Sequence, residues 1–165
     1  MTEQKSKTVK ESAIENYKIV MPEDSNPGVV NINGGVVLKI IDDVAGIVSL
    51  RHCRSRTVTA SIDKMDFIYP AKVGEILIVK SSVNCVFKTS LEIGVKVEVE
   101  NIFTGERHTT GKAYLTFVSV DKQGKPIEVP YKIVPETNDE KRRYNEAQIR
   151  RKLRLEQREK MKELK

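Results

Sequence analysis

The sequence predicts an α+β fold, in which a long central helix is wrapped by a curved antiparallel sheet and a basic helix ends the chain. Apolar residues between 36 and 52 follow a helical period, and they cover so much of the helix surface that other structure must surround it. After residue 56 the period changes to two, which is typical of strands. Residues 136–165 return to a helical pattern, with eleven Lys/Arg against seven Asp/Glu. These three observations predict the fold class.

The composition indicates one ordinary globular domain. The chain has 165 residues, of which 39% are hydrophobic and 32% are charged, with a net charge of +6. No run reaches the ~18–20 apolar residues of a membrane span, and the polar start of the chain lacks the apolar segment of a secretory signal. Two cysteines and two histidines are too few for a disulfide scaffold or a multi-histidine metal site. We therefore expect a cytoplasmic protein without a resident metal or cofactor.

The elements are expected in a simple order. Residues 1–16 form a polar, flexible N-terminus, and an edge strand at 17–21 is followed by a loop rich in Asp, Asn, Pro and Gly. The central helix covers 36–52, and the strands of the sheet cover 57–63, 75–87, 90–103 and 108–120. The folded domain is thus expected at 17–135, and the C-terminal basic helix at 136–165 begins with acids near its positive end.

Gly34, Gly35 and Asp42 are the residues that indicate chemistry. The two glycines begin the central helix, where backbone N–H groups at the positive end of the helix suit an acyl oxygen that gains negative charge; alternatively, they only make the turn. Asp42 lies seven residues after Gly35, on the same face but two turns, or ~10 Å, away. Because long strands leave unpaired edges, we expect a dimer, in which Asp42 of one copy can face Gly35 of the other. There it could act as a general base or attack a carbonyl. The alternative is an acid paired with Lys39.

For the remaining candidate residues, a structural role explains the sequence better than a functional one. Asn26 could hold a water molecule or a carbonyl oxygen, but it lies among turn-forming residues. His52 and His108 have no plausible Ser or Cys partner in the sequence and are expected to be structural. Gly-x-Ser-x-Gly, P-loop and dinucleotide-binding motifs do not occur in the sequence. The basic tail could contact nucleic acid, but Tyr144 is its only aromatic residue, which disfavours stacking on bases.

A long set of motifs, spread from about residue 21 to residue 151, carries a family resemblance. It comprises Asn31-Ile-Asn-Gly-Gly-Val-Val-Leu-Lys-Ile-Ile-Asp-Asp-Val-Ala-Gly46, Arg51-His-Cys53, Val58-Thr-Ala-Ser-Ile-Asp63, Asp66-Phe67, Thr89-Ser-Leu-Glu92, Phe103-Thr-Gly105 and Val134-Pro-Glu-Thr137. These motifs resemble those of the hotdog-fold acyl-CoA thioesterases, in the branch that includes bacterial short- and medium-chain enzymes and the mammalian brain-type cytosolic acyl-CoA hydrolase. The resemblance implies a double-hotdog dimer, commonly assembled into a trimer of dimers, that hydrolyses acyl-CoA to a free acid and coenzyme A.

The resemblance also implies residue roles. Asp42 matches the catalytic acid, Asn26 matches the loop asparagine that works with it across the dimer interface, and Gly35 matches the glycine whose N–H polarises the thioester carbonyl. Two departures bear on Asn26, because relatives carry His or Phe at the position of Asn33 and one extra residue precedes the glycine pair; Asn31 and Asn33 are the alternatives. The residues implied to lie near coenzyme A are Thr57, Val58, Thr59, Val86, Phe87, Lys88 and Arg150, of which the last two are basic and suit its phosphates.

Two functions follow from these expectations. The first is an acyl-CoA thioesterase of fatty acid metabolism that works as a homo-oligomer, with acyl-CoA as its substrate. The alternative is a non-catalytic hotdog protein that binds acyl-CoA or a lipid as a regulator. Asp42 distinguishes them, because a sensor has no need of a carboxylate beside the thioester. Membrane and nucleic-acid partners are not expected.

Overall fold

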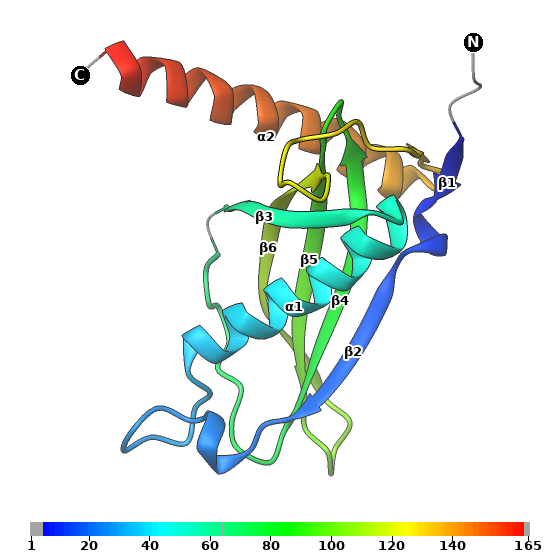
Figure 1. The fold of residues 1–165 in the computed structure, drawn as a ribbon. Helices are drawn as coiled ribbons and strands as arrows, with labels where there is room; N and C mark the ends of the chain where they lie inside the picture. The colour runs from blue at the N-terminus through cyan, green and yellow to red at the C-terminus, as the bar shows by residue number, and fades with distance from the viewer. Residues whose placement is uncertain (1–4, 64, 164–165) are drawn as a thin grey trace.

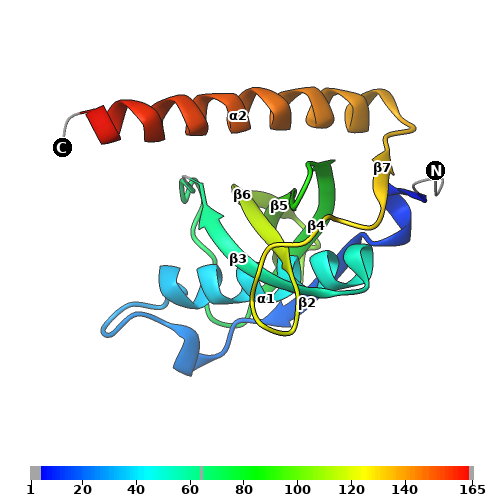
Figure 2. The same cartoon turned by 45° about the horizontal axis from the view of Figure 1, so that its top comes forward.

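The computed structural model describes residues 5–63 and 65–163. In chain order its elements are β1 (Ser6–Thr8), the 3₁₀ helix η1 (Val9–Glu11), β2 (Ile14–Ile19), the 3₁₀ helix η2 (Pro22–Asp24), α1 (Gly34–Cys53), β3 (Arg56–Ile62), β4 (Ile76–Val86), β5 (Ser90–Glu100), β6 (Arg107–Val120), β7 (Lys132–Val134) and α2 (Asn138–Glu163). Five antiparallel strands in the order β2-β4-β5-β6-β3 curl around α1. The helix α2 crosses the opposite face of this sheet (Figures 1 and 2). The predicted α+β architecture is confirmed.

The central helix α1 is buried on one face only. Val37, Ile41 and Val48 are almost fully buried against the sheet, as an apolar helical stripe predicts. Ile47 and Leu50 are each 48% exposed, although the sequence predicts a helix that is wrapped by other structure. One copy of the chain therefore covers the sheet side of α1 and leaves apolar side chains on the other side open.

The N-terminal segment is more ordered than its composition suggests. Residues 6–8, within the segment that we expected to be flexible, form β1, which pairs in parallel with β7. The strand β2 begins at Ile14 rather than Tyr17, because Ile14 pairs with Ser81 of β4. Lys7 Nζ donates to the carbonyl oxygens of the last turn of α1, at 3.0 and 2.6 Å. The segment thus caps the negative end of α1 with a positive charge.

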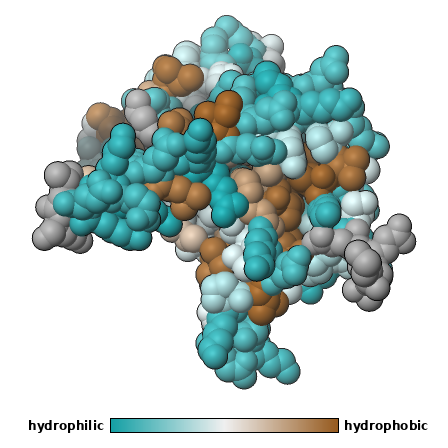
Figure 3. All heavy atoms as spheres, turned by 90° about the horizontal axis from the view of Figure 1, so that it is seen from above, coloured by the Kyte–Doolittle hydropathy of each residue, from teal (hydrophilic) through white to brown (hydrophobic). Residues whose placement is uncertain are grey.

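The C-terminal helix α2 is largely hydrophilic on its outer surface (Figure 3). Ala147 is fully buried against the rest of the chain, whereas Ile149, Leu153 and Met161 are more than half exposed. Within residues 5–63 and 65–163, neither α1 nor α2 combines the length and the apolar character that crossing a membrane requires.

Candidate active site

The start of α1 is held by an asparagine pair. Asn33 is the N-cap of α1, and its Oδ1 accepts a hydrogen bond from the Gly35 backbone N–H at 2.8 Å. Asn33 Nδ2 donates to Asn26 Oδ1, also at 2.8 Å. The Asn33 backbone N–H donates to the carbonyl oxygen of Asp24, which ties the preceding loop to the helix. The structure thus brings together Asn26, Asn33 and Gly35, and Asn33 is the residue that links the other two.

The two glycines at the helix start lie close to their neighbours. A Cβ added to Gly34 would lie 3.3 Å from the Phe67 ring, and one added to Gly35 would lie 3.0 Å from Asn33 Oδ1. Both contacts are tighter than ordinary van der Waals contact, so larger residues would push the ring or the cap away. The glycine pair therefore permits a close approach and is not explained by the turn alone.

Asp42 lies farther along α1 and is half-buried. Its Oδ1 accepts a hydrogen bond from Thr59 Oγ1 of β3 at 2.8 Å. The alternative role, an ion pair with Lys39, belongs to the neighbouring residue: Lys39 Nζ lies 2.6 Å from Asp43 Oδ2. The hydrogen bond and the charge of Asp43 raise the pKa of Lys39. The structure therefore holds Asp42 through a neutral hydroxyl, while Lys39, whose pKa the charge of Asp42 also raises, makes its ion pair with Asp43.

The strand β3 is joined to α1 by a second hydroxyl contact. Ser49 Oγ and Thr57 Oγ1 lie 2.6 Å apart, and Ser49 also donates to the Gly46 carbonyl oxygen. Two side chains predicted to lie near coenzyme A, Thr57 and Thr59, thus also orient β3 against the helix that carries Asp42. These two pairings have no signature in the sequence, because they join residues of different elements.

The turn between β4 and β5 carries the other predicted segment. The Phe87 ring lies 4.2 Å from the guanidinium carbon of Arg151, which places a basic residue of α2 over this turn. Val86 ends β4, and Lys88 is exposed beside Phe87. Lys88 and Arg151 therefore offer two positive charges at the turn between β4 and β5.

Arg150 faces a different partner. Its Nη2 donates to Glu92 Oε1 at 2.7 Å, and its guanidinium carbon lies 3.6 Å from the centre of the Tyr114 ring. Glu92 is fully buried and also accepts from Asn84 Nδ2 at 3.1 Å. A phosphate would therefore have to compete with a buried carboxylate for Arg150, whereas Arg151 already lies at the turn.

The two histidines lie apart from Asp42. His52 is fully buried, and its Nε2 lies 3.0 Å from the carbonyl oxygen of Tyr131. Burial lowers the pKa of His52, which favours its neutral form. His108 stacks on Tyr69, with ring centres 4.1 Å apart. Among the residues that the structure describes, no group of three or more His, Cys, Asp and Glu side chains is arranged to hold a metal ion.

Comparison with known proteins identifies the family. A family model described as the thioesterase superfamily matches residues 31–103. The uncharacterized acyl-CoA thioester hydrolase YkhA of Bacillus subtilis is 42% identical over 141 residues, which cover 84% of this chain and 79% of the relative. This chain belongs to the hotdog-fold acyl-CoA thioesterases. The cytosolic acyl coenzyme A thioester hydrolase of Rattus norvegicus is 37% identical over 72% of this chain, but the match covers 32% of the relative. The chain thus spans about a third of the length of this mammalian relative.

Solved structures of other family members have the same fold. An acyl-CoA hydrolase from Bacillus cereus superposes with a TM-score of 0.90 at 33% identity, covering 97% of this chain and 96% of that one. The acyl-CoA hydrolase of Staphylococcus aureus, solved with butyryl coenzyme A, coenzyme A and coenzyme A disulfide, has a TM-score of 0.87 at 33% identity, over 96% and 95% of the two chains. An apo-hexameric acyl-CoA thioesterase is 39% identical with a TM-score of 0.88, over 93% of this chain and 97% of that chain.

Proposed function

We propose that this protein hydrolyses acyl-CoA thioesters to a free carboxylic acid and coenzyme A, with Asp42 as the catalytic carboxylate. The observation that carries the proposal is the half-buried Asp42, held by Thr59 Oγ1 at 2.8 Å with no ion pair to Lys39. The names of its relatives support the substrate class. Variants of the Staphylococcus aureus enzyme with one aspartate, one asparagine or one threonine replaced by alanine have also been solved. These are the side-chain types of Asp42, Asn26 and Thr59.

Two routes are open to a carboxylate in this position. As a general base, Asp42 takes a proton from water while the water oxygen attacks the thioester carbonyl carbon; the C–S bond breaks and the proton passes to the sulfur. As a nucleophile, Asp42 forms an anhydride with release of the thiol, and water then opens the anhydride. Thr59 donates to Oδ1, so we propose that Oδ2 takes the proton or attacks the carbonyl carbon.

We propose that the site is shared between two copies. Within one chain, Gly35 and Asp42 are separated by two turns of α1, or ~10 Å. The exposed Ile47 of α1 and Val58, which is 50% exposed on the edge strand β3, offer an apolar surface for a second copy beside Asp42. Pairing along β3 would bring the Gly35 N–H of the partner toward Asp42. An acyl oxygen there must share that N–H with Asn33 or displace it.

Coenzyme A is proposed to lie along β3 and the β4–β5 turn, where Thr57, Val58, Thr59, Val86, Phe87 and Lys88 are found. Arg150 remains a predicted contact, but its guanidinium is paired with Glu92. Arg151 over Phe87 has the better geometry for a phosphate group. A methionine substitution at each arginine separates the two possibilities.

The deciding experiment compares two adjacent aspartates. Thiol release is followed for acyl-CoA substrates from acetyl to palmitoyl with wild type, Asp42→Asn and Asp43→Asn. Because removal of a general base costs about 10²–10⁴-fold in rate, Asp42→Asn should lower kcat by at least about a hundredfold. Asp43 is exposed and paired with Lys39, so Asp43→Asn should stay within about twofold of wild type.

Near-normal hydrolysis by Asp42→Asn would contradict the catalytic role. Binding of every acyl-CoA without turnover by the wild type would instead favour the acyl-CoA or lipid sensor. Sedimentation of the active protein tests the shared site, since an active monomer cannot contain one. A hexamer is the expected assembly, as the hexameric relative suggests.

We also propose that the protein acts in the cytoplasm. The name of the rat relative and the two buried free cysteines, Cys53 and Cys85, support this location. Fractionation of cells expressing the tagged chain, followed by immunoblotting, tests it; recovery in the membrane fraction would contradict it.

A further inference from the structure

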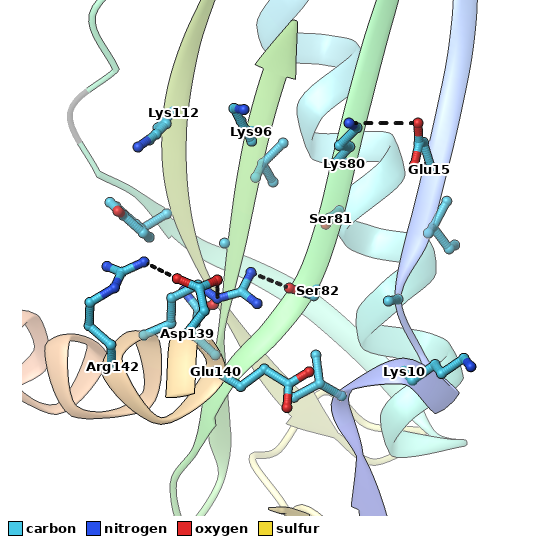
Figure 4. Close-up of a pocket in the computed structure, with 18 residues that line it drawn as sticks. Lys10, Glu15, Lys80, Ser81, Ser82, Lys96, Lys112, Asp139, Glu140 and Arg142 are labelled. Carbon is cyan, nitrogen blue, oxygen red and sulfur yellow. Dashed lines mark hydrogen bonds and ion pairs between the residues drawn. The ribbon is translucent and has the colours of Figure 1, made fainter. Parts of the chain in front are cut away.

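A pocket lies on the face of the sheet opposite α1. It has a volume of about 780 Å³ and is lined by residues of η1, β2, β4, β5 and β6 and of the first turns of α2. This volume is within the ~300–1,000 Å³ of small-molecule sites. Figure 4 shows the pocket with α1 behind the sheet, so Asp42 and this pocket lie on opposite sides. The pocket plays no part in the proposed hydrolysis.

The floor of the pocket carries a row of three lysines. Lys80 on β4 lies directly opposite Lys96 on β5, and Lys96 lies directly opposite Lys112 on β6. Figure 4 shows these three residues on neighbouring strands. Like charges at directly opposed positions destabilise a sheet, so the row is unfavourable unless anions neutralise it. Neighbouring strands are ~4.8 Å apart, so the row extends over ~10 Å.

The protein supplies part of the neutralising charge. Glu98 lies 2.7 Å from Lys80 and 2.6 Å from Lys96, and hydrogen bonds from both lysines lower its pKa. Glu15 on β2 is 3.9 Å from Lys80. Lys112 lies outside this group, toward Asp139 at the start of α2, whose pKa it helps Arg142 to lower. One carboxylate thus serves two lysines, and Asp139, the anion near Lys112, is already paired with Arg142 and Arg143.

The start of α2 adds charges of both signs. Asp139 pairs with Arg142, and Arg143 Nε lies 3.2 Å from its other oxygen. Arg143 also donates to Ser82 Oγ at 3.4 Å, inside the pocket (Figure 4). In all, the lining has six basic residues, Lys10, Lys80, Lys96, Lys112, Arg142 and Arg143, and three acidic residues, Glu15, Asp139 and Glu140. With Glu98, which pairs with Lys80, and Glu146, which pairs with Arg142, the basic residues still outnumber the acidic ones, six against five.

We propose that this pocket binds a small anion with two or more linked phosphates. A row of cations over ~10 Å matches several negative charges along one molecule better than a single carboxylate. Lysine and arginine donors are those that proteins use for phosphate groups. The pocket also has room for an organic group attached to the phosphates.

The test uses inorganic pyrophosphate as the probe and isothermal titration calorimetry as the readout. The full chain is titrated with coenzyme A present at saturation, so that phosphate sites of the proposed substrate are occupied. The wild type should bind one pyrophosphate per chain. The double variant Lys96→Gln/Lys112→Gln should bind at least about tenfold more weakly, because two charge-assisted hydrogen bonds are lost. It is expected to fold, since like charges are removed from opposed positions.

The matched control is Lys122→Gln/Lys125→Gln, which removes the same charge from the exposed turn after β6. Its affinity for pyrophosphate should remain within about twofold of the wild type.

Equal weakening of pyrophosphate binding in both double variants would overturn the proposal in favour of general charge attraction. Absence of binding, or binding that coenzyme A abolishes, would also overturn it. If the wild type does not bind pyrophosphate and the pocket variant changes the sedimentation of the oligomer, the row is an interface between copies and the proposal fails. Asp42→Asn should bind pyrophosphate normally, which keeps this test independent of catalysis.

Discussion

Arg150→Met is expected to destabilise the protein before it weakens coenzyme A binding. Arg150 makes three hydrogen bonds to Glu92, of 2.7, 3.2 and 3.2 Å, and Glu92 has 0% exposure. Without Arg150 this carboxylate would keep the 3.1 Å bond from Asn84 Nδ2. Removing one partner of a buried ion pair costs about 3–5 kcal/mol. Because the Arg150 side chain itself is 21% exposed, we expect a loss near the lower limit, about 3 kcal/mol.

Differential scanning calorimetry measures this loss directly. For a chain of this size each kcal/mol shifts Tm by about 2–4 °C, so Arg150→Met should lower Tm by about 6–12 °C. Arg151→Met removes the same charge from the adjacent position and should shift Tm by no more than about 2 °C, while raising KM for acyl-CoA. The double variant Arg150→Met/Glu92→Met should recover most of the lost stability, since no buried charge is left alone. An unchanged Tm together with a raised KM in Arg150→Met would refute this reasoning and identify Arg150 as a coenzyme A ligand.

Three further predictions concern single side chains. Thr59→Val should lower kcat by about tenfold or more, because Asp42 loses a hydrogen bond of about 1.5–3 kcal/mol. Thr59→Ser should retain activity in the same thiol-release assay, and an equal loss of kcat in both variants would contradict the role of the hydroxyl. Asn33→Ala should cost about 0.5–2 kcal/mol in denaturant unfolding through loss of the cap, whereas Asn33→Asp, which keeps an acceptor for the Gly35 N–H, should lose less; a reversed order would exclude the cap as the cause. Burial lowers the pKa of His52 in the folded state, so the unfolded chain binds more protons and stability should fall as pH decreases below about 6.5. His52→Gln should lose that part of the pH dependence between pH 7.5 and 5.5 in thermal unfolding, and an unchanged slope would show that other groups cause it.

Local periodicity was sufficient to locate most of the sheet. The strands expected at 75–87, 90–103 and 108–120 are observed as β4, β5 and β6, with ends displaced by three residues or fewer. Their side chains alternate between two environments, and this alternation is visible in the sequence. The strand β1 shows no such alternation. It is held by its pairing with β7, which is far from it in the sequence. Such a pairing depends on the folded arrangement, which explains why residues 6–8 were expected to be flexible.

The candidate site could be predicted only in part. Asp42 was recognisable because an acid interrupts an apolar helix, and the separation from Gly35 follows from helical geometry. The contact between Asp42 and Thr59 joins α1 to β3 and has no sequence period, so Thr59 was expected only near coenzyme A. Arg150 was expected near coenzyme A because the family resemblance implies a basic residue at this place in the C-terminal helix. Its pairing with Glu92 depends on where α2 crosses the sheet, which no local pattern specifies.

The lysine row, in contrast, could have been found from the sequence. Lys80, Lys96 and Lys112 are equally spaced along the chain, and the turns expected between the long strands lie midway between successive lysines. An antiparallel hairpin places residues that are equidistant from its turn opposite each other. The equal spacing and the two turns therefore predict three lysines side by side on one face, as the observed register has them. The three lysines are separated in sequence by strongly alternating segments. When each strand is considered alone, each lysine is therefore interpreted as an ordinary solvent-facing residue. Charge clusters of this kind are recognised only when the registers of neighbouring strands are combined. They indicate function because opposed like charges lower the stability of the sheet unless an anion neutralises them.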